Sequence, residues 1–147
     1  MREILFRGKR EYTGEWVEGY LYITQRGQYE ISRYSKSYDC ERYTSVVIPS
    51  TVGQYTGLTD KNGKKIFEGD ILAGDDYPFT SDSERNYFAE VVWFDNCPVF
   101  GTVTHRNPKS NVRGISDGNA DFIEDFESIK WEVIGNIHDN KEILDVK

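Results

Sequence analysis

Hydrophobic and polar residues alternate along much of the chain with the two-residue period of a β-strand. Residues 15–23 show the alternation most clearly, with Gly19 near their middle. One face of the expected strand carries Trp16, Glu18, Tyr20 and Tyr22, and the opposite face carries Val17, Leu21 and Ile23. A glycine in the middle of a strand indicates a bulge or the close approach of another backbone.

Further segments with strand-like patterns occur along the whole chain, at residues 2–7, 28–34, 45–49, 87–94, 99–104 and 130–137. Residues 66–72 contain an acidic, glycine-containing turn that feeds a strand, a pattern that recurs at strand entries of small SH3-like barrels. Val, Ile and Thr greatly outnumber Ala, Leu and Met, which favours strands over helices. Short helices are expected at residues 121–129, from helical spacing of apolar residues, and at residues 140–144, where Asp139 can act as the cap. The sequence thus predicts a mainly β fold, a small barrel-like domain (SH3-like or related) with additional hairpins and one or two short helices.

The stretch from Gly57 to Lys65 has a superficial likeness to a phosphate-binding loop. Its glycine spacing is one residue too long, and Lys65 stands where Ser or Thr should bind the metal. Asn62 and Gly63 both tolerate positive φ, so they indicate a tight turn between two strands. We therefore expect a hairpin here and not a nucleotide site.

The chain has 147 residues, the size of one domain. A second description divides it into two subdomains, N-terminal strands in residues 1–57 and a barrel-like part in residues 58–147. Residues 1–57 carry 8 basic and 7 acidic side chains, whereas residues 58–147 carry 10 and 18. The net charge of -7 argues against general nucleic-acid binding by phosphate neutralisation.

The cellular location expected from the sequence is the cytosol. No run of apolar residues is long enough to span a membrane, and the first residues lack the apolar run of a signal peptide. Cys40 and Cys97 are too few for a disulfide framework.

A basic cluster precedes the expected strand at residues 15–23. The candidate binding residues for a nucleic acid or another partner are Arg7, Lys9, Arg10, Trp16 and Tyr20. Aromatic rings beside basic side chains can stack on the bases of single-stranded nucleic acid. The competing interpretation is a charged hairpin turn beside core aromatic residues, and the acidic remainder of the chain favours it.

Carboxylates are the remaining candidates for chemistry. Asp70, Asp75 and Asp76 could hold a divalent cation, and Glu90, Glu132 and Asp70 lie at or beside strong strands, where a pair could perform acid–base work. These carboxylates fit equally well as solvent-exposed side chains of loops and strands that have no chemical role. His105 and His138 are far apart in sequence and belong to no zinc motif. We expect no catalytic residue, no metal and no cofactor.

Several segments, in order and spacing, resemble the YopX family of phage and prophage proteins. They include Arg7-Gly8-Lys9, Gly14-Glu15-Trp16-Val17, Val52-Gly53-Gln54-Tyr55-Thr56-Gly57-Leu58, Ile66-Phe67-Glu68-Gly69-Asp70-Ile71, Val91-Val92-Trp93 and Glu132-Val133-Ile134-Gly135-Asn136-Ile137-His138-Asp139-Asn140. Residues 97–129 depart from the pattern, so the resemblance implies a variable insertion at about these residues within the second subdomain. The resemblance implies a mostly β fold, a phage or prophage origin and a location in the host cytoplasm. It implies no established activity, so no catalytic residue is transferred.

The leading hypothesis is a non-catalytic phage accessory protein that binds a phage or host protein, or a second copy of itself. Ten Tyr, eight Phe and three Trp are many for so small an interior, so some should lie at the surface, where aromatic residues favour protein interfaces. The alternatives are a single-stranded nucleic-acid-binding protein and a carboxylate or metal-dependent hydrolase.

Overall fold

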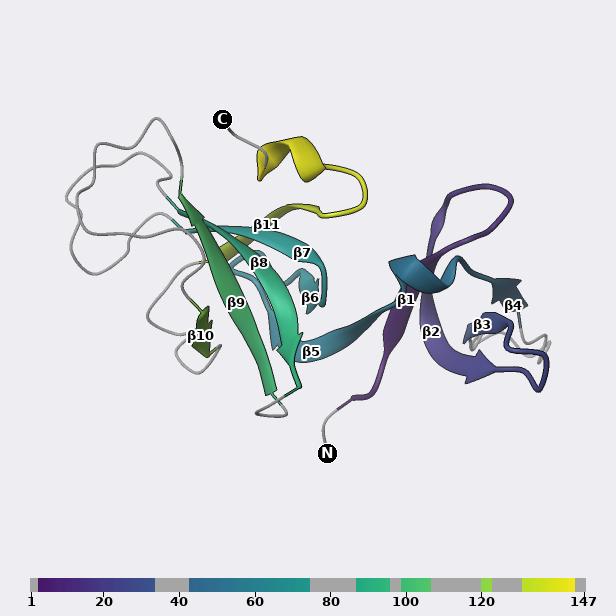
Figure 1. Ribbon diagram of the computed structural model, residues 1–147. Coiled ribbons are helices and arrows are strands. Elements are labelled where there is room, and N and C mark those ends of the chain that lie inside the picture. Colours follow the sequence, from purple (N-terminus) through teal and green to yellow (C-terminus); the bar gives the residue numbers. More distant parts are fainter. Residues whose placement is uncertain are drawn as a thin grey trace. The chain divides into compact units, whose positions relative to one another are not determined.

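A computed structural model describes residues 3–33, 43–74, 87–95, 99–106, 120–122 and 131–144. These residues form strands and two short 3-10 helices, which confirms the prediction of a mainly β fold. The strands make two antiparallel sheets, and the chain divides into two compact units, Met1–Gly57 and Leu58–Lys147 (Figure 1). Each unit has its own hydrophobic core.

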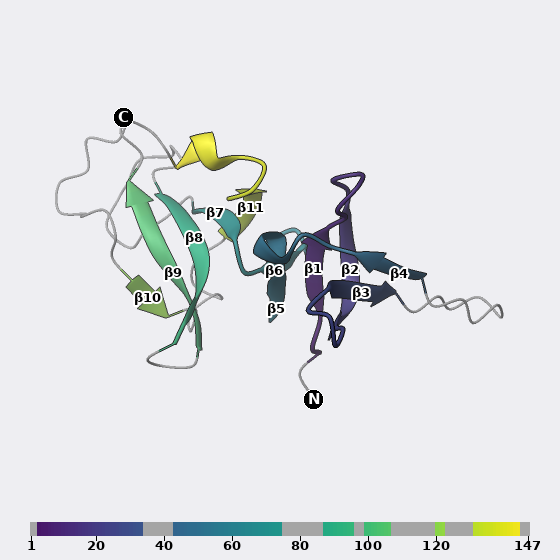
Figure 2. The same ribbon diagram turned by 45° about the vertical axis from the view of Figure 1, so that its right-hand side comes forward.

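The first unit is built from consecutive antiparallel strands, shown from a second side in Figure 2. Its elements are β1 (Phe6–Lys9), β2 (Trp16–Ile23), β3 (Tyr29–Arg33), β4 (Tyr43–Val46) and the 3-10 helix η1 (Pro49–Thr51), followed by β5 (Gly53–Thr59). The strand order in this sheet is β4-β3-β2-β1-β5-β6. The start of β5 pairs with β1 within this unit.

Alternate residues of β2 and β3 face the inner side of this sheet, and most of those residues are apolar, so the inner face is apolar. Its buried members are Val17, Ile31 and Val47, against which Phe6, Leu21, Tyr29 and Val52 pack. Gly19 lies opposite Phe6 on β1, and a Cβ atom at Gly19 would fall on the backbone carbonyl of Ser32. The close backbone approach predicted from this glycine is therefore confirmed.

The described strands form two antiparallel sheets and no closed barrel, so the barrel-like, SH3-like part of the prediction is not confirmed. The end of β4 does return to the end of β1: Ile48 N–H donates to the carbonyl of Lys9 at 2.9 Å, and Arg10 and Val47 form a β-bridge. That bridge is isolated and does not extend into a ladder. A barrel needs a continuous ladder around the sheet, and one bridge does not provide it.

The second unit contains a five-stranded sheet in the order β10-β9-β8-β7-β11. Its elements are β6 (Lys65–Phe67), β7 (Asp70–Gly74), β8 (Tyr87–Phe94), β9 (Val99–Arg106), β10 (Ala120–Phe122), β11 (Trp131–Asn136) and the 3-10 helix η2 (Lys141–Ile143). Its core consists of Ile66, Leu72, Ala89, Val91, Phe100, Trp131 and Val133, with Leu58 packed against it. β8 has the bounds predicted from the sequence.

Within residues 66–72, Glu68 and Gly69 form the glycine-containing turn that the sequence predicts, and this turn separates β6 from β7. Gly69 causes the break, because its φ of 82° is left-handed and opens a turn between the two strands. The turn is anchored on both sides: Gly69 N–H donates to the carbonyl of Val91 at 2.8 Å, and the Gly69 carbonyl accepts from Ile137 N–H at 2.9 Å.

Both predicted helices are wrong in part. Residues 120–122 form β10, whose Phe122 pairs with Gly101 of β9, so sheet pairing overrides the local helical spacing. Residues 123–129 lie outside the described residues. The C-terminal segment makes only the 3-10 helix η2, without a side-chain cap, since the carboxylate of Asp139 instead accepts from the side-chain amide of Asn136 at 3.0 Å. No helix in the described part is long and apolar enough to cross a membrane.

Candidate functional site

The outer face of the first sheet presents two tyrosines to solvent. We call this surface the outer face and define it by Trp16, Glu18, Tyr20 and Tyr22 of β2 with their cross-strand neighbours. The side chains of Tyr20 and Tyr22 are 60% and 59% exposed, whereas Val17 on the opposite face is 6% exposed. The division of β2 into two faces is therefore as predicted, except that Ile23 at the strand end is also exposed.

A pair of cations covers the indole ring of Trp16. Lys9 lies directly opposite Trp16 in the β1–β2 register, with its Nζ 5.4 Å from the ring centroid. The guanidinium carbon of Arg7 lies 4.7 Å from the same centroid. Each cation–π contact contributes about 0.5–1 kcal/mol at a partly exposed site. The structure thus brings Arg7, Lys9 and Trp16 together, and it places Tyr20 on the same face.

Arg10 lies apart from this cluster. Its Nη1 forms an ion pair with Glu15 Oε2 at 3.2 Å in the turn between β1 and β2. An exposed ion pair of this kind contributes about 0–1 kcal/mol, so it positions the side chain more than it stabilises the fold. Of the five candidate binding residues, Arg10 is the one that the structure does not place on the outer face.

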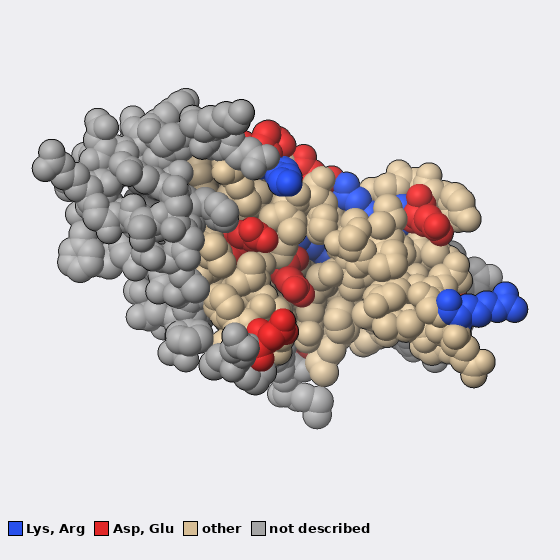
Figure 3. Space-filling view, viewed as in Figure 1, with Lys and Arg blue, Asp and Glu red and all other residues tan. Residues whose placement is uncertain are grey.

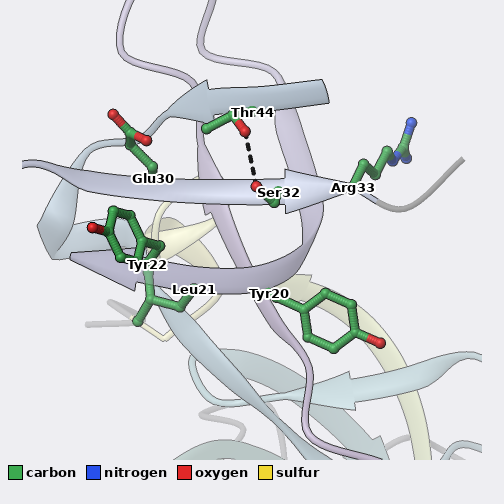
Figure 4. Close-up of a pocket in the computed structure, with 7 residues that line it drawn as sticks. All are labelled: Tyr20, Leu21, Tyr22, Glu30, Ser32, Arg33 and Thr44. Carbon is green, nitrogen blue, oxygen red and sulfur yellow. Dashed lines mark hydrogen bonds between the residues drawn. The ribbon is translucent and has the colours of Figure 1, made fainter. Parts of the chain in front are cut away.

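Beside the exposed tyrosines the outer face is hollowed into a groove of about 490 Å³ (Figure 4). The groove is lined by Tyr20, Leu21, Tyr22, Glu30, Ser32, Arg33 and Thr44. The β2–β3–β4 register explains five of these residues, because Tyr20 lies opposite Ser32, Ser32 opposite Thr44, and Tyr22 opposite Glu30. Leu21 and Arg33 occupy the intervening strand positions, and Leu21 also packs against the inner core. The hydroxyl oxygens of Ser32 and Thr44 are 2.8 Å apart and share a hydrogen bond.

The described charges on the side seen in Figure 3 do not form a broad basic patch. Acidic side chains are scattered among uncharged residues, and the described Lys and Arg side chains stand singly or in small groups. Binding of a nucleic-acid backbone draws on several neighbouring cations. On this side the described residues provide no such array.

The phosphate-loop-like stretch is a hairpin between β5 and β6, as the Asn62-Gly63 pair predicts. Its backbone N–H groups are directed to a carboxylate of the chain itself: Asn62 N–H and Lys64 N–H each donate to Asp60 Oδ1 at 2.8 Å. Burial alone would raise the pKa of Asp60, but these N–H groups, that of Val133 and the nearby Lys64 charge lower it below its ordinary value. The Asp60 carboxylate therefore accepts the N–H groups of Asn62 and Lys64 within this turn.

Comparison with known proteins agrees with the sequence motifs. The family model described as YopX protein matches residues 5–145, nearly the whole chain. The chain belongs to the YopX family. Among solved structures, the crystal structure of protein EF1440 from Enterococcus faecalis is similar, with a TM-score of 0.50 and 24% sequence identity over 99% of this chain and 100% of that chain. This likeness shows the fold alone, and no curated protein matches.

The carboxylates considered for chemistry have structural contacts in this YopX protein. Asp70 is 1% exposed, and its Oδ2 accepts the N–H of Phe67 at 2.8 Å. Glu132 forms an ion pair with Lys61 at 3.3 Å, and Glu90 lies opposite Ile71 in the β7–β8 register. Within the described ranges no group of three or more His, Cys, Asp and Glu side chains could hold a metal ion.

Asp75 and Asp76, the other two members of the proposed cation cluster, lie outside the described residues. The cluster as a whole therefore stays a sequence hypothesis.

Sequence reasoning missed most of the groove in this YopX protein. The alternation assigns Tyr22 to the correct face, but the sequence candidates do not include Glu30, Ser32, Arg33 or Thr44. The alternation in residues 28–34 contained a signal for Glu30 and Ser32, since it predicted a strand there. Thr44 had no such signal, because residues 35–45 are polar and poorly patterned, and only its pairing with Ser32 places it at the groove.

Proposed function

We propose that this YopX protein is a non-catalytic protein-interaction module that binds its partner on the outer face of β2, β3 and β4. The observation that supports the proposal is the exposure of Tyr20 and Tyr22, side by side on one strand and bordering a groove. Tyrosine provides a large contact area at a small entropic cost and is enriched in protein interfaces. The partner is a phage or host protein, or a second copy of the chain.

The charges of the outer face favour a protein over a nucleic acid. Glu18 and Glu30 lie among the aromatic residues, where they would repel phosphate groups. The ring of Trp16 already carries two cations, which occupy a surface that a base would need for stacking. A protein surface can match such a mixture of charges. An origin in a phage or prophage and a location in the host cytoplasm are part of the proposal and rest on the family resemblance.

The test is affinity capture with a matched control. Immobilised wild-type protein and a Tyr20→Ser/Tyr22→Ser variant are exposed to nuclease-treated lysate of phage-induced bacterial cells. A Tyr12→Ser variant is the control, because Tyr12 is 91% exposed and lies in the β1–β2 turn. We expect one set of proteins to be retained by the wild type and by Tyr12→Ser and lost by the double variant. Identical retention by all three proteins would contradict the proposal.

A second candidate function is binding of single-stranded nucleic acid, which the pair of cations on Trp16 favours. Fluorescence anisotropy with labelled oligothymidylate tests it. If it holds, affinity falls steeply with salt, and Arg7→Ala/Lys9→Ala abolishes binding while Arg26→Ala, in the β2–β3 turn, has a smaller effect. Equal, salt-insensitive signals from all variants would exclude it.

A further inference from the structure

The outer face carries opposite charges at the two ends of β2. Lys9 lies opposite Trp16, where the strand begins. Glu30 lies opposite Tyr22, near the end of the strand. Trp16 and Tyr22 are six residues apart, an even number, so they point to the same side of the sheet. Residues directly opposite each other in a ladder also share a side, and Lys9 and Glu30 therefore both lie on the outer face.

The two charges lie diagonally across this face. β1 and β3 flank β2, so Lys9 and Glu30 are separated by two strand spacings, about 10 Å. Along the strand direction they are separated by six residues, about 20 Å. The midpoint of the diagonal falls on β2 between Glu18 and Tyr20. The 60% exposed ring of Tyr20 thus stands near the centre of the face, with a cation at one end and a carboxylate at the other.

Both end groups can reach a partner in solution. The side chains of Lys9 and Glu30 are partly exposed. Within the part of the chain that the structure describes, the Glu30 carboxylate has no ion-pair partner, and Figure 4 shows Tyr22 next to it. The Lys9 ammonium lies 5.4 Å from the centroid of the Trp16 ring, which keeps it on the outer face. An ammonium has three N–H donors, so this contact leaves it able to donate to a carboxylate.

This layout of charge is complementary to itself. A two-fold axis that lies crosswise to the diagonal, between two facing sheets, places the outer faces of two copies against each other and exchanges the ends of the diagonal. Lys9 of each copy then meets the partner's Glu30, and the exposed tyrosines of both copies lie between the two ion pairs. A symmetric dimer requires a patch that matches itself in this way.

We propose that two copies of this YopX protein form a symmetric dimer through their outer faces, oriented by two equivalent ion pairs between Lys9 and Glu30. The aromatic centre around Tyr20 supplies contact area, and the charged ends select the orientation. This inference rests on the proposed function and names the partner as a second copy of the chain.

Sedimentation velocity over a series of protein concentrations tests the dimer. Lys9→Glu places acid against acid at both ends of the interface, and Glu30→Lys places base against base. Each variant should raise the dimer dissociation constant at least about tenfold. Arg26→Glu is the matched control, because it reverses a charge in the β2–β3 turn, away from the diagonal, and should dimerise like the wild type.

A mixture of the two single variants makes the test specific. In a mixed dimer the Lys9→Glu chain presents acids at both ends and the Glu30→Lys chain presents bases at both ends, so each contact again joins opposite charges. The mixture should recover dimers with about the wild-type affinity, and so should the double variant Lys9→Glu/Glu30→Lys. Damage to the fold of either single variant would not be repaired by mixing, and circular dichroism checks each chain separately.

Three results would overturn the inference. A monomeric wild type, in combination with protein capture that still depends on Tyr20 and Tyr22, would leave the proposed function intact and remove the second copy as its partner. Dimers that persist unchanged in Lys9→Glu and Glu30→Lys would assign self-association to another surface. Loss of dimers in both variants without recovery on mixing would show that the two residues do not meet across the interface.

Discussion

Asp60 Oδ2 accepts the backbone N–H of Val133 at 3.0 Å, although 73 residues separate the two in the chain. Next to this bond, Lys61 N–H donates to the carbonyl of Trp131 at 3.0 Å. The β5–β6 turn therefore pairs with the outer edge of β11, at the end of the five-stranded sheet. An edge strand with open hydrogen-bonding groups invites aggregation, and the turn occupies two of these groups.

Replacement of Asp60 by Ala should strongly destabilise the protein. It removes the common acceptor of the N–H groups of Asn62, Lys64 and Val133. The loss of several such bonds at a buried position should lower the free energy of unfolding by about 2–4 kcal/mol. Urea denaturation measures the change. Asp95→Ala, at an exposed position after β8, should change it by less than about 0.5 kcal/mol, and similar effects for both variants would contradict this account.

The same carboxylate should make stability dependent on acid. Burial would raise the pKa of Asp60, but its hydrogen bonds to Val133, Lys64 and Asn62 outweigh burial, and the pKa lies below its ordinary value of 3.8. A carboxylate with a lowered pKa in the folded state stabilises the protein above its unfolded-state pKa, and this contribution is lost as the pH falls through the folded-state pKa. The free energy of unfolding should therefore decline below about pH 4.

Urea denaturation across this pH range, on the wild type and on Asp60→Asn, isolates the contribution. The amide does not titrate, so the decline should be shallower in the variant. Parallel curves for the two proteins would assign the acid sensitivity to other groups.

Gly19→Ala should destabilise the first unit by steric overlap. The added Cβ would meet the carbonyl of Ser32, which is backbone and cannot rotate away, at a cost of about 1–3 kcal/mol. Gly27→Ala is a useful comparison, because a Cβ there meets nothing within 4 Å and only the positive φ of 77° is unfavourable, by about 1 kcal/mol. Chemical denaturation ranks the two, and an equal or larger effect at Gly27 would contradict the close approach of β2 and β3.

Leu72→Ala should open a cavity in the second core. Leu72 is fully buried among the side chains of that cluster, so truncation should cost about 2–5 kcal/mol in the free energy of unfolding. Ile4→Ala removes apolar atoms from a side chain that is already 59% exposed and should cost far less. A small effect at Leu72, measured by thermal or urea unfolding, would show that the core is packed differently.

Local patterns in the sequence determined several features because their causes lie within a few residues. The two faces of β2 follow from the alternation of Cβ atoms along an extended chain, which is why Tyr20 and Tyr22 could be assigned to one face. The turn at Asn62 and Gly63 follows from the tolerance of these residues for positive φ, and Gly63 has a φ of 78°. The YopX motifs are likewise visible in the sequence, because each consists of a few residues in a fixed order.

Tertiary structure alone decided which of these segments meet. Phe122 lies in a strand because Gly101 of β9 pairs with it, and Thr44 lines the groove because Ser32 lies beside it. The described strands of the first sheet do not close, because the bridge between Arg10 and Val47 is isolated. Pairing of distant segments depends on packing and register across the whole fold, and a local pattern contains no information about its partner. The sequence by itself therefore determined the strands and their faces, and the fold decided the groove.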